Sequence, residues 1–460
     1  MAFDRLATMT GGRLLTAASH DRKFTGVSSD SRTIEPGQLF FAIKGEKHDG
    51  HEHIDQAVSR GAAGLIVRRG FFADRAMPAT TAVVEVADTH EAMLKLAAEY
   101  MKTLPAKRVG ITGSNGKTTT KEFTYRLLSA VEENIYRSPG NFNNLYGIPL
   151  ALFAMPNNTS MAILEMGISV PGEMNRLASL VRPHLMAVTN VGPTHLEFLG
   201  SVEAVAREKL RAVHHCEPGA PLIVNADDPV LMAEARRVHS RPITFGILND
   251  ADFRPLKIRE TKYATYVAID YQEFRLPLFG QYQVYNLLCA YAIARVMGAF
   301  FDEIDTTTIK LTTPSMRGEV VASQGITFIS DCYNANPESV SAGLKSFHLR
   351  QHTGRKVVVL GDMLELGEPT VEYHRDIGKQ LADYDFDLIL AVGPMSRYTI
   401  ESARGSGVTA VRLRYFDDAR SCALASVELL RPGDLVYLKG SRGIGLEAVL
   451  KEFVKSEGDA

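Results

Sequence analysis

Short runs of apolar and β-branched residues alternate with longer segments of mixed polarity along almost the whole chain. The runs have the length and composition of buried strands, and the segments between them have the length of helices. This alternation is typical of parallel sheets covered by helices, so we predict an α/β fold. The clearest strands are Arg108–Thr112, Met161–Met166, Leu185–Val191, Pro221–Asn225, Lys356–Leu360, Leu388–Val392 and Asp434–Leu438. The clearest helices are Lys117–Ala130, Ser201–His214 and Tyr373–Ala382.

Breaks in this pattern divide the chain into three expected domains, at residues 1–86, 87–313 and 314–460. The first break lies in Ala87–Lys107, where a helix-like stretch ends before Pro105, because the residue before a proline disfavours helix. The second lies near Leu311–Pro314, where the pattern restarts. In Ala251–Pro277 the strands are shorter and alternating, which predicts an antiparallel hairpin at a sheet edge. A length of 460 residues also agrees with about three domains.

The composition excludes several classes of protein. Hydrophobic residues make up 45% and charged residues 23% of the chain, which is typical of a globular protein. Lys and Arg number 51 against 53 Asp and Glu, so the net charge of −2 gives no overall attraction to nucleic acid or anionic lipid. No apolar run is long enough to span a bilayer, and the first residues contain no signal-peptide core. We expect a cytoplasmic protein without nucleic-acid partners or membrane insertion.

The four cysteines exclude a zinc ribbon and argue against a disulfide framework. Cys216, Cys289, Cys332 and Cys422 are far apart and form no C-x-x-C pair.

A glycine-rich segment, Gly110–Thr119, follows a predicted strand and opens a predicted helix. Its glycines allow backbone N–H groups to turn toward phosphate oxygens, and the helix N-terminus adds partial positive charge. Lys117 would contact the β- and γ-phosphates of ATP, and the Thr118 hydroxyl would bind Mg²⁺. Ile111 stands where the usual pattern has its first glycine, so a plain strand–helix turn is the alternative. The predicted ATP-binding residues here are Gly113, Ser114, Asn115, Gly116, Lys117, Thr118 and Thr119.

A second glycine motif, Gly443–Ala448, matches the G-x-G-x-x-A pattern of dinucleotide-binding proteins. Such a site also needs an acidic residue about 20 positions further on, and the sequence ends before that point. We therefore interpret this motif as a packing turn.

Polar residues follow several of the predicted strands, where an open α/β sheet binds its ligands. Glu165 ends one strand and His195 follows another, so both could face the phosphate loop. Mg²⁺ needs hard oxygen ligands, which Glu165 would supply. Lys209 lies on a predicted helix, and taken alone it indicates only a solvated surface lysine.

Two polar loops admit more than one interpretation. Asn225–Pro229 could be a simple Asx turn or could hold the ribose or base of a nucleotide. Asp331 precedes the asparagine-rich segment Tyr333–Pro337, whose proline is typical of a helix start. The density of polar groups there favours a binding site.

The longest motifs of the chain resemble those of the Mur ligases of bacterial peptidoglycan synthesis. In the central part they are GITGSNGKTTT from Gly110, NFNNLYGIPLAL from Asn141, LEMG from Leu164, TNVGPTHLEFLGSVEAVAREK from Thr189 and NADDP from Asn225. The N-terminal segments Asp30–Arg32, Pro36–Phe40 and Gly45–His51 resemble the uridine-nucleotide-binding domain of that family.

The C-terminal motifs resemble one branch of the family, which adds D-Ala-D-Ala to UDP-MurNAc-tripeptide. They are Met316–Gly318, DCYNANPES from Asp331, GDMLELGE from Gly361 and LKGSRGIGLE from Leu438. The D-N-P-R motif of the sister enzyme that adds diaminopimelate is absent.

The resemblance implies both a fold and a reaction. The fold has a small N-terminal α/β uridine-nucleotide-binding domain, a central phosphate-loop ATPase domain with a parallel sheet, and a C-terminal Rossmann-like α/β domain. In the reaction, the terminal carboxylate of the tripeptide attacks the γ-phosphate of ATP and forms an acyl phosphate. The amine of D-Ala-D-Ala then attacks the acyl phosphate and expels phosphate. Positioning and charge neutralisation would supply most of the catalysis.

The resemblance also implies roles for single residues. Lys117, Lys209 and His195 would be catalytic; Thr118 and Glu165 would bind one Mg²⁺, His195 would help to bind a second, and Lys209 would be carbamylated by CO₂ and serve the metal site. Further ATP contacts would come from Asn225, Asn286, Arg317 and Asp331. The UDP part of the substrate would contact Ser31, Arg32 and Gly45, and the peptide part Asn143, Asn144, Asn334 and Asn336. His374 also matches a family motif, without an assigned role.

The sequence departs from the family pattern at two positions, and other functions stay open. Tyr282 stands where the family often has a histidine, and Glu319 replaces the second arginine of R-G-R. A sister ligase that adds one amino acid, a folylpolyglutamate synthase and an ATP-gated binding protein or motor are the alternatives. The uridine-type domain argues against a folate enzyme, and a motor would have Asp rather than Glu165 after its metal-binding strand. We expect a monomer.

Overall fold

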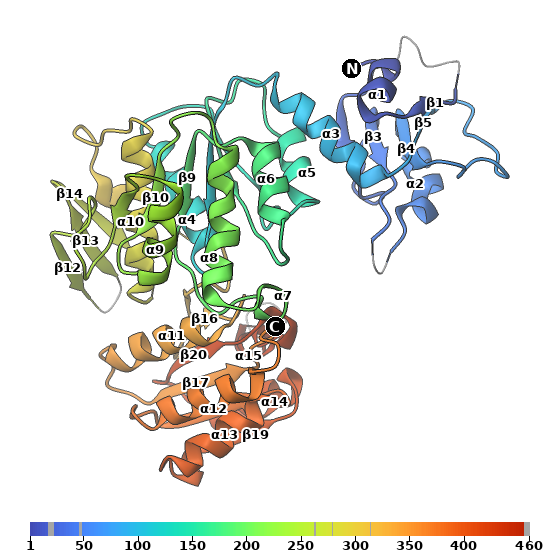
Figure 1. Cartoon of the computed structure of the whole chain (residues 1–460). Helices are drawn as coiled ribbons and strands as arrows, with labels where there is room; N and C mark the ends of the chain where they lie inside the picture. The colour runs from blue at the N-terminus through green and yellow to red at the C-terminus, as the bar shows by residue number, and fades with distance from the viewer. Residues whose placement is uncertain (17–22, 46–47, 262–263, 278, 313, 455–460) are drawn as a thin grey trace.

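The computed structural model describes the chain except for residues 17–22, 46–47, 262–263, 278, 313 and 455–460. It contains three α/β units and a small additional sheet, and the N-terminal unit projects to one side of the other two (Figure 1). The predicted α/β class with mainly parallel sheets is confirmed. The predicted second boundary involves residue 313, which lies outside the described residues, as do residues 46–47 of the uridine-type motif.

The N-terminal unit is a five-stranded sheet in the order β1-β5-β4-β3-β2, in which only β1 runs antiparallel to its neighbour. Phe3 and Leu6 of α1 are fully buried against one face of this sheet, together with Leu39 and Phe41 of β3. The elements are α1 (Phe3–Thr10), β1 (Arg13–Leu14), β2 (Gly26–Ser28), β3 (Gln38–Phe41), α2 (Ile54–Ser59), β4 (Gly64–Arg68), β5 (Ala82–Val86) and α3 (Thr89–Met101).

Helix α3 joins the N-terminal unit to the central one. It packs on α1 and on the central helices α5 and α6. His90 of α3 stacks on Tyr146 with ring centroids 4.0 Å apart, and Glu91 pairs with Arg176 of α6. The predicted first domain boundary precedes this helix and stays a prediction, because α3 contacts both sides.

The central unit is a six-stranded, fully parallel sheet in the order β11-β10-β9-β6-β8-β7. Its strands are β6 (Lys107–Thr112), β7 (Ile135–Arg137), β8 (Met161–Glu165), β9 (Leu185–Val188), β10 (Leu222–Asn225) and β11 (Ile243–Phe245). Its helices are α4 (Lys117–Leu128), α5 (Gly147–Phe153), α6 (Glu173–Val181), α7 (Leu196–Leu199), α8 (Val202–Leu210), α9 (Pro229–Val238) and α10 (Tyr282–Val296).

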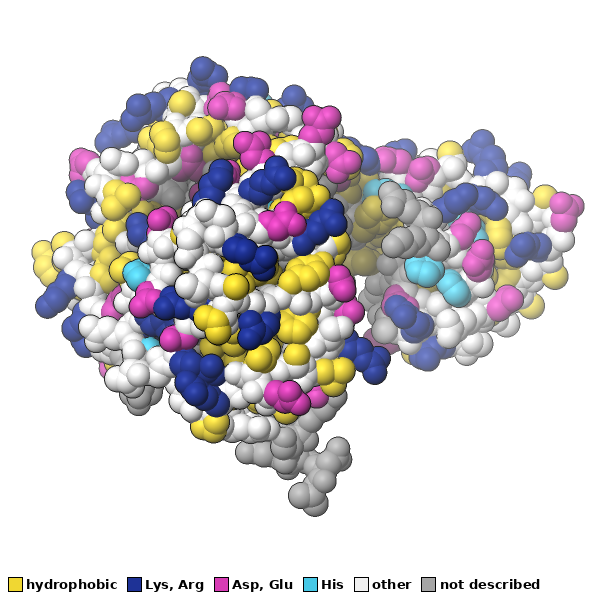
Figure 2. All heavy atoms as spheres, turned by 90° about the horizontal axis from the view of Figure 1, so that it is seen from below, with side chains coloured by type: hydrophobic (Ala, Val, Ile, Leu, Met, Phe, Trp, Pro, Cys, Tyr) yellow, Lys and Arg dark blue, Asp and Glu magenta, His cyan; other side chains and the backbone are white. Residues whose placement is uncertain are grey.

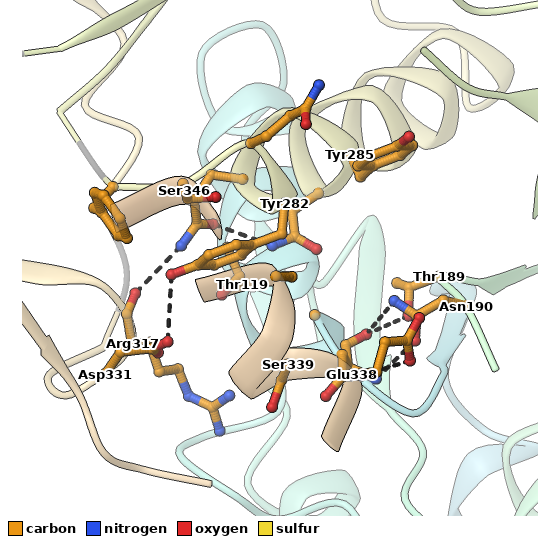
Figure 3. A pocket seen from close by; sticks show the side chains of 18 of the residues that line it. Thr119, Thr189, Asn190, Tyr282, Tyr285, Arg317, Asp331, Glu338, Ser339 and Ser346 are labelled. Atoms are coloured by element: carbon orange, nitrogen blue, oxygen red, sulfur yellow. Dashed lines mark hydrogen bonds between the residues drawn. The ribbon is translucent and has the colours of Figure 1, made fainter. Parts of the chain in front are cut away.

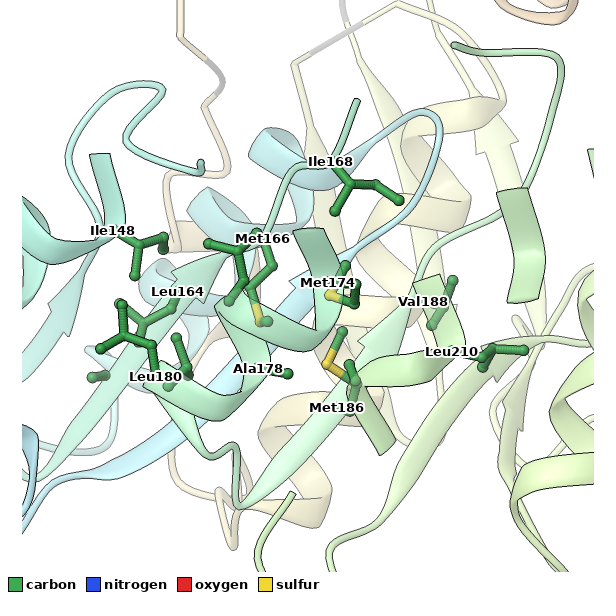
Figure 4. Packing of buried hydrophobic residues seen from close by; sticks show 14 of the residues in the cluster. Ile148, Leu164, Met166, Ile168, Met174, Ala178, Leu180, Met186, Val188 and Leu210 are labelled. Atoms are coloured by element: carbon green, nitrogen blue, oxygen red, sulfur yellow. The ribbon is translucent and has the colours of Figure 1, made fainter. Parts of the chain in front are cut away.

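Helices cover both faces of the central sheet, and each face has its own core. Met166, Met174 and Met186 belong to the core on the side of α5 and α6 (Figure 4). The opposite core contains the inward face of α4 and almost the whole of α10, for example Phe123 and Leu287. Burial on both faces explains why the strand sequences are continuously apolar rather than alternating.

Two predicted elements of the central unit extend three or more residues beyond those observed. The strand expected at Leu185–Val191 ends at Val188, because Thr189 and Asn190 turn to bind the phosphate loop. The helix expected at Ser201–His214 is α helix only to Leu210 and continues as a 3₁₀ helix at Arg211–His215.

The alternating segment at Ala251–Pro277 does not form the predicted edge hairpin. It forms a separate antiparallel sheet, β12 (Lys257–Glu260), β13 (Thr265–Ile269) and β14 (Gln272–Leu276), although residues 262–263 lie outside the described part. Phe274 and Val267 are fully buried against α10, and Phe253, just before this sheet, forms a parallel bridge with Phe245 of β11. Side-chain packing and this short bridge together anchor the sheet to the central unit.

The C-terminal unit is a six-stranded sheet in the order β15-β16-β20-β17-β18-β19, antiparallel only at β15. Leu446, which lies within the second glycine motif, is fully buried in this unit, as expected for a packing turn. The strands are β15 (Glu319–Ser323), β16 (Ile326–Asp331), β17 (Lys356–Gly361), β18 (Leu388–Val392), β19 (Leu413–Phe416) and β20 (Leu435–Lys439). The helices are α11 (Pro337–Leu349), α12 (Thr370–Leu381), α13 (Ser396–Gly405), α14 (Ala419–Leu429) and α15 (Glu447–Val454).

The surface and the cysteines agree with the composition. On the face seen from below, Lys and Arg side chains are interspersed with acidic and apolar ones (Figure 2). All four cysteines are free. Within the described residues, no helix is both long and apolar enough to cross a membrane.

Candidate active site

A cavity of about 1280 Å³ lies between the central and C-terminal units (Figure 3). The central unit contributes the phosphate loop, Glu165 and the polar loops that follow β9 and β10. The C-terminal unit contributes Arg317, Asp331, Tyr333, one side of α11 and the segment 350–353 that follows it. The carboxyl ends of the central strands therefore face a second α/β unit rather than open solvent.

Two glycines shape the phosphate loop between β6 and α4. Gly113 has φ +151°, and a Cβ there would lie 1.9 Å from Thr189 Oγ1. Gly116 has φ +81°, and its Cβ would lie 2.1 Å from Asn286 Oδ1. Neither position accepts a side chain without displacing a neighbour, so the loop is closely fitted to the residues beneath it.

Lys117 folds back over this loop. Its Nζ donates to the carbonyl oxygens of Gly113 at 2.7 Å and Ser114 at 3.2 Å. Burial lowers the pKa of the Lys117 ammonium, and the nearby Glu165 carboxylate opposes this effect. These contacts differ from those expected of a solvated lysine in a plain strand–helix turn. The amine is positioned where a bound phosphate would compete with two loop carbonyls for it.

Glu165, at the end of β8, has one carboxylate oxygen that accepts no hydrogen bond within the described part of the chain, although the Lys121 ammonium lies 3.7 Å from it. Asn143 Nδ2 donates to Oε1 at 2.8 Å, whereas the buried Oε2 accepts no hydrogen bond from the described residues. Together with Thr118, which also lines the cavity, this oxygen suits Mg²⁺, which takes few protein ligands and keeps waters and phosphate oxygens. No group of three or more His, Cys, Asp and Glu residues arranged for a metal occurs in the described part of the chain.

Lys121 is a site residue that the sequence reasoning missed. It lies one helical turn after Lys117 on α4, is fully buried, and donates to the carbonyls of Ser138 at 2.8 Å and Gly140 at 2.9 Å. Its Nζ is 3.7 Å from Glu165 Oε2. The i, i+4 spacing from Lys117 was the available signal, because it places both lysines on one helix face.

Lys209 is not the solvated surface lysine that its local sequence indicates. It is 1% exposed, and its Nζ donates to Gly113 O at 3.1 Å, beneath the phosphate loop. Burial first, and the positive charge of Lys117 second, hold the pKa of Lys209 well below its usual range. The inward face of α8 therefore carries a buried lysine whose amine loses its proton more readily than that of a solvated lysine.

His195 lies outside the cavity walls but contacts the C-terminal unit. Its Nδ1 is 3.2 Å from Glu365 Oε2, in the loop after β17. Both residues have left-handed backbone, with φ +55° for His195 and +62° for Glu365. The contact leaves the other ring nitrogen of His195 available to a ligand.

Among the predicted ATP residues, Asn225 and Asn286 support the site from the central unit. Asn225 Oδ1 accepts from the N–H of Asp227 at 3.0 Å, and Asp227 caps the segment 247–249 through three backbone N–H groups. Asn286 accepts from Thr120 Oγ1 at 3.4 Å and packs under Gly116. Both residues line the cavity.

Asp331 and Arg317 are the corresponding residues of the C-terminal unit. Asp331 Oδ2 accepts from Tyr437 at 2.9 Å, from Lys439 at 3.0 Å and from Tyr282 at 3.4 Å. The Arg317 guanidinium lies over the Tyr333 ring, 3.9 Å from its centroid. Tyr282 thus uses its hydroxyl in a contact between the two units (Figure 3). Tyr282 and Lys439 were not predicted as site residues.

The four asparagines predicted for the peptide part lie in different surroundings. Asn143 and Asn334 line the cavity. Asn144 Oδ1 accepts from the N–H groups of Tyr146 and Gly147 at the start of α5. Asn336 is 3% exposed and caps α11. In this arrangement only Asn143 and Asn334 present surface to the cavity.

The residues predicted for the UDP part are on the N-terminal unit and do not line this cavity. Ser31 Oγ donates to Gln56 Oε1 at 2.7 Å, and Arg32 pairs with Asp30 at 2.7 Å. This pair lowers the pKa of Asp30 to about 2. The Gly45 N–H donates to His48 O at 2.8 Å.

His374 has a clear structural role. Its Nε2 accepts from the N–H of Met363 at 3.1 Å, and its Nδ1 contacts Thr370 O at 2.7 Å. Burial lowers the pKa of this histidine, which suits a neutral ring that accepts a hydrogen bond. His374 therefore holds the loop that carries Glu365.

Models of one protein family match three consecutive parts of the chain. Residues 23–101 match the Mur ligase family, catalytic domain; residues 111–294 match the Mur ligase middle domain; residues 316–442 match the Mur ligase, glutamate ligase domain. The three matches correspond to the three α/β units.

Whole-chain comparisons give the same result. The chain is 32% identical over 457 residues to the UDP-N-acetylmuramoyl-tripeptide–D-alanyl-D-alanine ligase of Bacillus subtilis, with 98% of each chain covered. Its fold is similar to that of MurF from Acinetobacter baumannii, with a TM-score of 0.87, 28% identity and 98% of each chain covered. A MurF ligase from Thermotoga maritima in complex with ADP gives a TM-score of 0.79 at 27% identity, over 94% of this chain and 97% of that one. The chain belongs to the Mur ligase family.

Proposed function

We propose that this chain is an ATP-dependent ligase that joins D-Ala-D-Ala to UDP-MurNAc-tripeptide, with ADP and phosphate as the other products. The activity for which the Bacillus subtilis relative is named supports this substrate pair, because that protein matches over 98% of each chain. The observation that carries the proposal is the shared cavity. The phosphate loop lines one wall, and Tyr333 and Asn334 of the branch-specific segment line the opposite one.

The chain would act mainly by holding two anions together. The carboxylate of the tripeptide and the γ-phosphate repel each other, so their approach needs positive charge fixed in advance. Lys117 supplies that charge from within the phosphate loop, and Lys121 holds Glu165 from behind. Mg²⁺ at Thr118 and Glu165, with a second ion at His195, would add further charge neutralisation at the phosphates.

Lys209 fits a carbamylated lysine. Carbamate formation requires a neutral amine, and burial beside Lys117 favours that form. A carbamate would replace a cation by an anion close to the phosphate loop. If so, activity in bicarbonate-depleted buffer falls and returns on addition of bicarbonate, and intact mass of the native protein gains one CO₂. Full activity of an unmodified Lys209 would contradict this part of the proposal.

The N-terminal unit would bind the uridine nucleotide through Ser31, Arg32 and Gly45, and the peptide would reach Asn143, Asn144, Asn334 and Asn336. Because the three UDP residues lie on a separate unit, the substrate must extend from that unit to the phosphate loop. The cytoplasmic location and the monomeric state remain predictions from the sequence.

The test is phosphate release from ATP, measured with each substrate omitted in turn. The proposal predicts release only when UDP-MurNAc-tripeptide and D-Ala-D-Ala are both present. Release with a single free amino acid in place of the dipeptide would indicate a sister ligase. Release without either substrate would indicate an ATP-gated protein of another class.

A further inference from the structure

Asn115 of the phosphate loop has its main chain fixed by its own unit. Its N–H donates to Asn190 Oδ1 at 2.8 Å. Its carbonyl accepts from Thr189 Oγ1 at 2.5 Å and from Asn190 Nδ2 at 3.3 Å. Thr189 and Asn190 directly follow β9, and both are seen beside Glu338 in Figure 3. The loop backbone at Asn115 is therefore held without help from the C-terminal unit.

The side chain of Asn115, in contrast, is held entirely by α11 of the C-terminal unit. Asn336 Nδ2 donates to Asn115 Oδ1 at 2.8 Å, and Asn115 Nδ2 donates to Glu338 Oε2 at 3.3 Å. Both partners lie at the first turn of α11. Both polar atoms of one phosphate-loop side chain thus depend on a unit more than 200 residues away in sequence.

The side chain of Asn336 has one donor group, Nδ2, and uses it for this contact. Its Oδ1 accepts from the N–H of Ser339 at 2.8 Å, and its own N–H donates to Ser339 Oγ at 3.1 Å, which forms a capping box. The cap fixes which end of the amide is oxygen, so the Nδ2 group faces Asn115. Asn336 is 3% exposed, so water cannot easily replace Asn115 as its partner.

The interface around this contact is tight. A Cβ on Gly192 would lie 2.1 Å from Glu338 Oε2. The loop after β9 therefore approaches α11 so closely that it leaves no room for a side chain. This close fit restricts the positions of α11 in which Asn336 reaches Asn115.

We propose that Asn336 is a positioning residue that links nucleotide affinity to the docking of the C-terminal unit through Asn115. The inference rests on the proposed role of the phosphate loop in binding ATP. With α11 docked, the Asn115 side chain is held in one orientation before nucleotide arrives, so binding does not have to order it. Linkage is reciprocal, so a bound nucleotide favours the docked unit to the same extent.

Asn336→Ser separates this role from helix capping. Serine is also a good N-cap and adds no charge, but its shorter side chain cannot reach Asn115. We expect the affinity of the full-length chain for ADP and for a non-hydrolysable ATP analogue, measured by calorimetry, to fall about five- to tenfold, as for one buried hydrogen bond. Ser341→Ala is the matched control, because Ser341 bonds only to Pro337 O within α11 and should leave affinity unchanged.

A double-mutant cycle shows whether Asn336 acts through Asn115. In an Asn115→Ala background, Asn336→Ser should cause no further loss of affinity. An equal loss in both backgrounds would mean a general disturbance of the C-terminal unit and would overturn the inference, as would unchanged affinity in Asn336→Ser alone. If the unaltered chain bound no nucleotide, the proposed function would fail together with this inference. Because the assay uses neither UDP-MurNAc-tripeptide nor D-Ala-D-Ala, an error in the substrate assignment leaves its outcome intact.

Discussion

Three charged side chains at the start of α4 and the end of β8 determine the chemistry of the site. Lys117 faces the phosphate loop, Glu165 offers one carboxylate oxygen to the cavity, and Lys121 lies behind Glu165 without access to solvent. The Lys121 ammonium lies 3.7 Å from Glu165 Oε2 and does not itself line the cavity. Lys121 therefore stabilises Glu165 and the 138–140 turn, whereas Lys117 is the residue that we propose contacts the nucleotide.

Lys121→Met tests this division of roles. The methionine fills a similar volume but leaves the Glu165 charge and two carbonyls without their buried partner. We expect the free energy of unfolding in urea to fall by roughly 3 kcal/mol. Lys102→Met, at a lysine that is 61% exposed, is the control and should change it by less than about 0.5 kcal/mol. Equal effects of the two substitutions would rule out a structural role for Lys121.

At the scale of elements, the phosphate loop depends on what lies beneath it. Gly116 begins α4 above Asn286 of α10, and Gly113 lies against Thr189 after β9. Helix α4 and its loop are thus fitted onto two neighbouring elements, and the conformation of the loop exists before any ligand binds.

Gly116→Ala and Gly172→Ala form a matched pair that separates backbone strain from this fit. Both glycines begin helices with similar φ, +81° and +87°, but a Cβ at Gly172 meets nothing within 4 Å, whereas one at Gly116 meets Asn286 Oδ1 at 2.1 Å. Each variant should lose about 1 kcal/mol from the left-handed backbone. Only Gly116→Ala should also lose tenfold or more, roughly, in ADP affinity by calorimetry. Similar ADP affinities in both variants would show that the fit to α10 does not matter.

At the scale of the whole molecule, the cavity is completed by contacts between units. Tyr282 reaches Asp331, His195 reaches Glu365, and Asn115 reaches α11. Glu338 at this interface is desolvated and repelled by the Asp228 carboxylate, and these effects raise the pKa of Glu338 to about 7. The interface therefore contains a group that changes charge near neutral pH.

Glu338→Gln should alter how stability depends on pH. An acid whose pKa is raised on folding binds more protons in the folded state, so its ionisation costs stability as pH rises from about 4.5 to 7. Glutamine avoids this cost, so the Tm of the variant relative to the unaltered chain should rise between pH 5 and pH 8. The Glu338 carboxyl group packs against Gly192 while much of the residue is open to solvent, so we expect only about 1 to 2 °C. Glu372→Gln, at an exposed position on α12, controls for the loss of a carboxylate; a pH-independent difference at Glu338 would contradict the argument.

Features encoded within a few residues could be predicted from the sequence, and contacts between distant segments could not. The order of strand, glycines, Lys117 and helix predicts the phosphate loop, and the position of Glu165 at a strand end predicts its place at the same edge. The local sequence of Lys209 indicates a surface lysine, because the loop that covers it lies 96 residues earlier in the chain. The link from Asn115 to Asn336 spans two units, so no local pattern contains it.

The most direct test of the proposed reaction follows the oxygen atoms. UDP-MurNAc-tripeptide carrying ¹⁸O in its terminal carboxylate is incubated with ATP and D-Ala-D-Ala, and the products are analysed by mass spectrometry. We expect one ¹⁸O in the released phosphate and one in the new amide of the pentapeptide product, because an acyl phosphate forms and breaks. Unlabelled phosphate would mean that water attacks ATP, and it would contradict the assignment of this cavity as a ligase site.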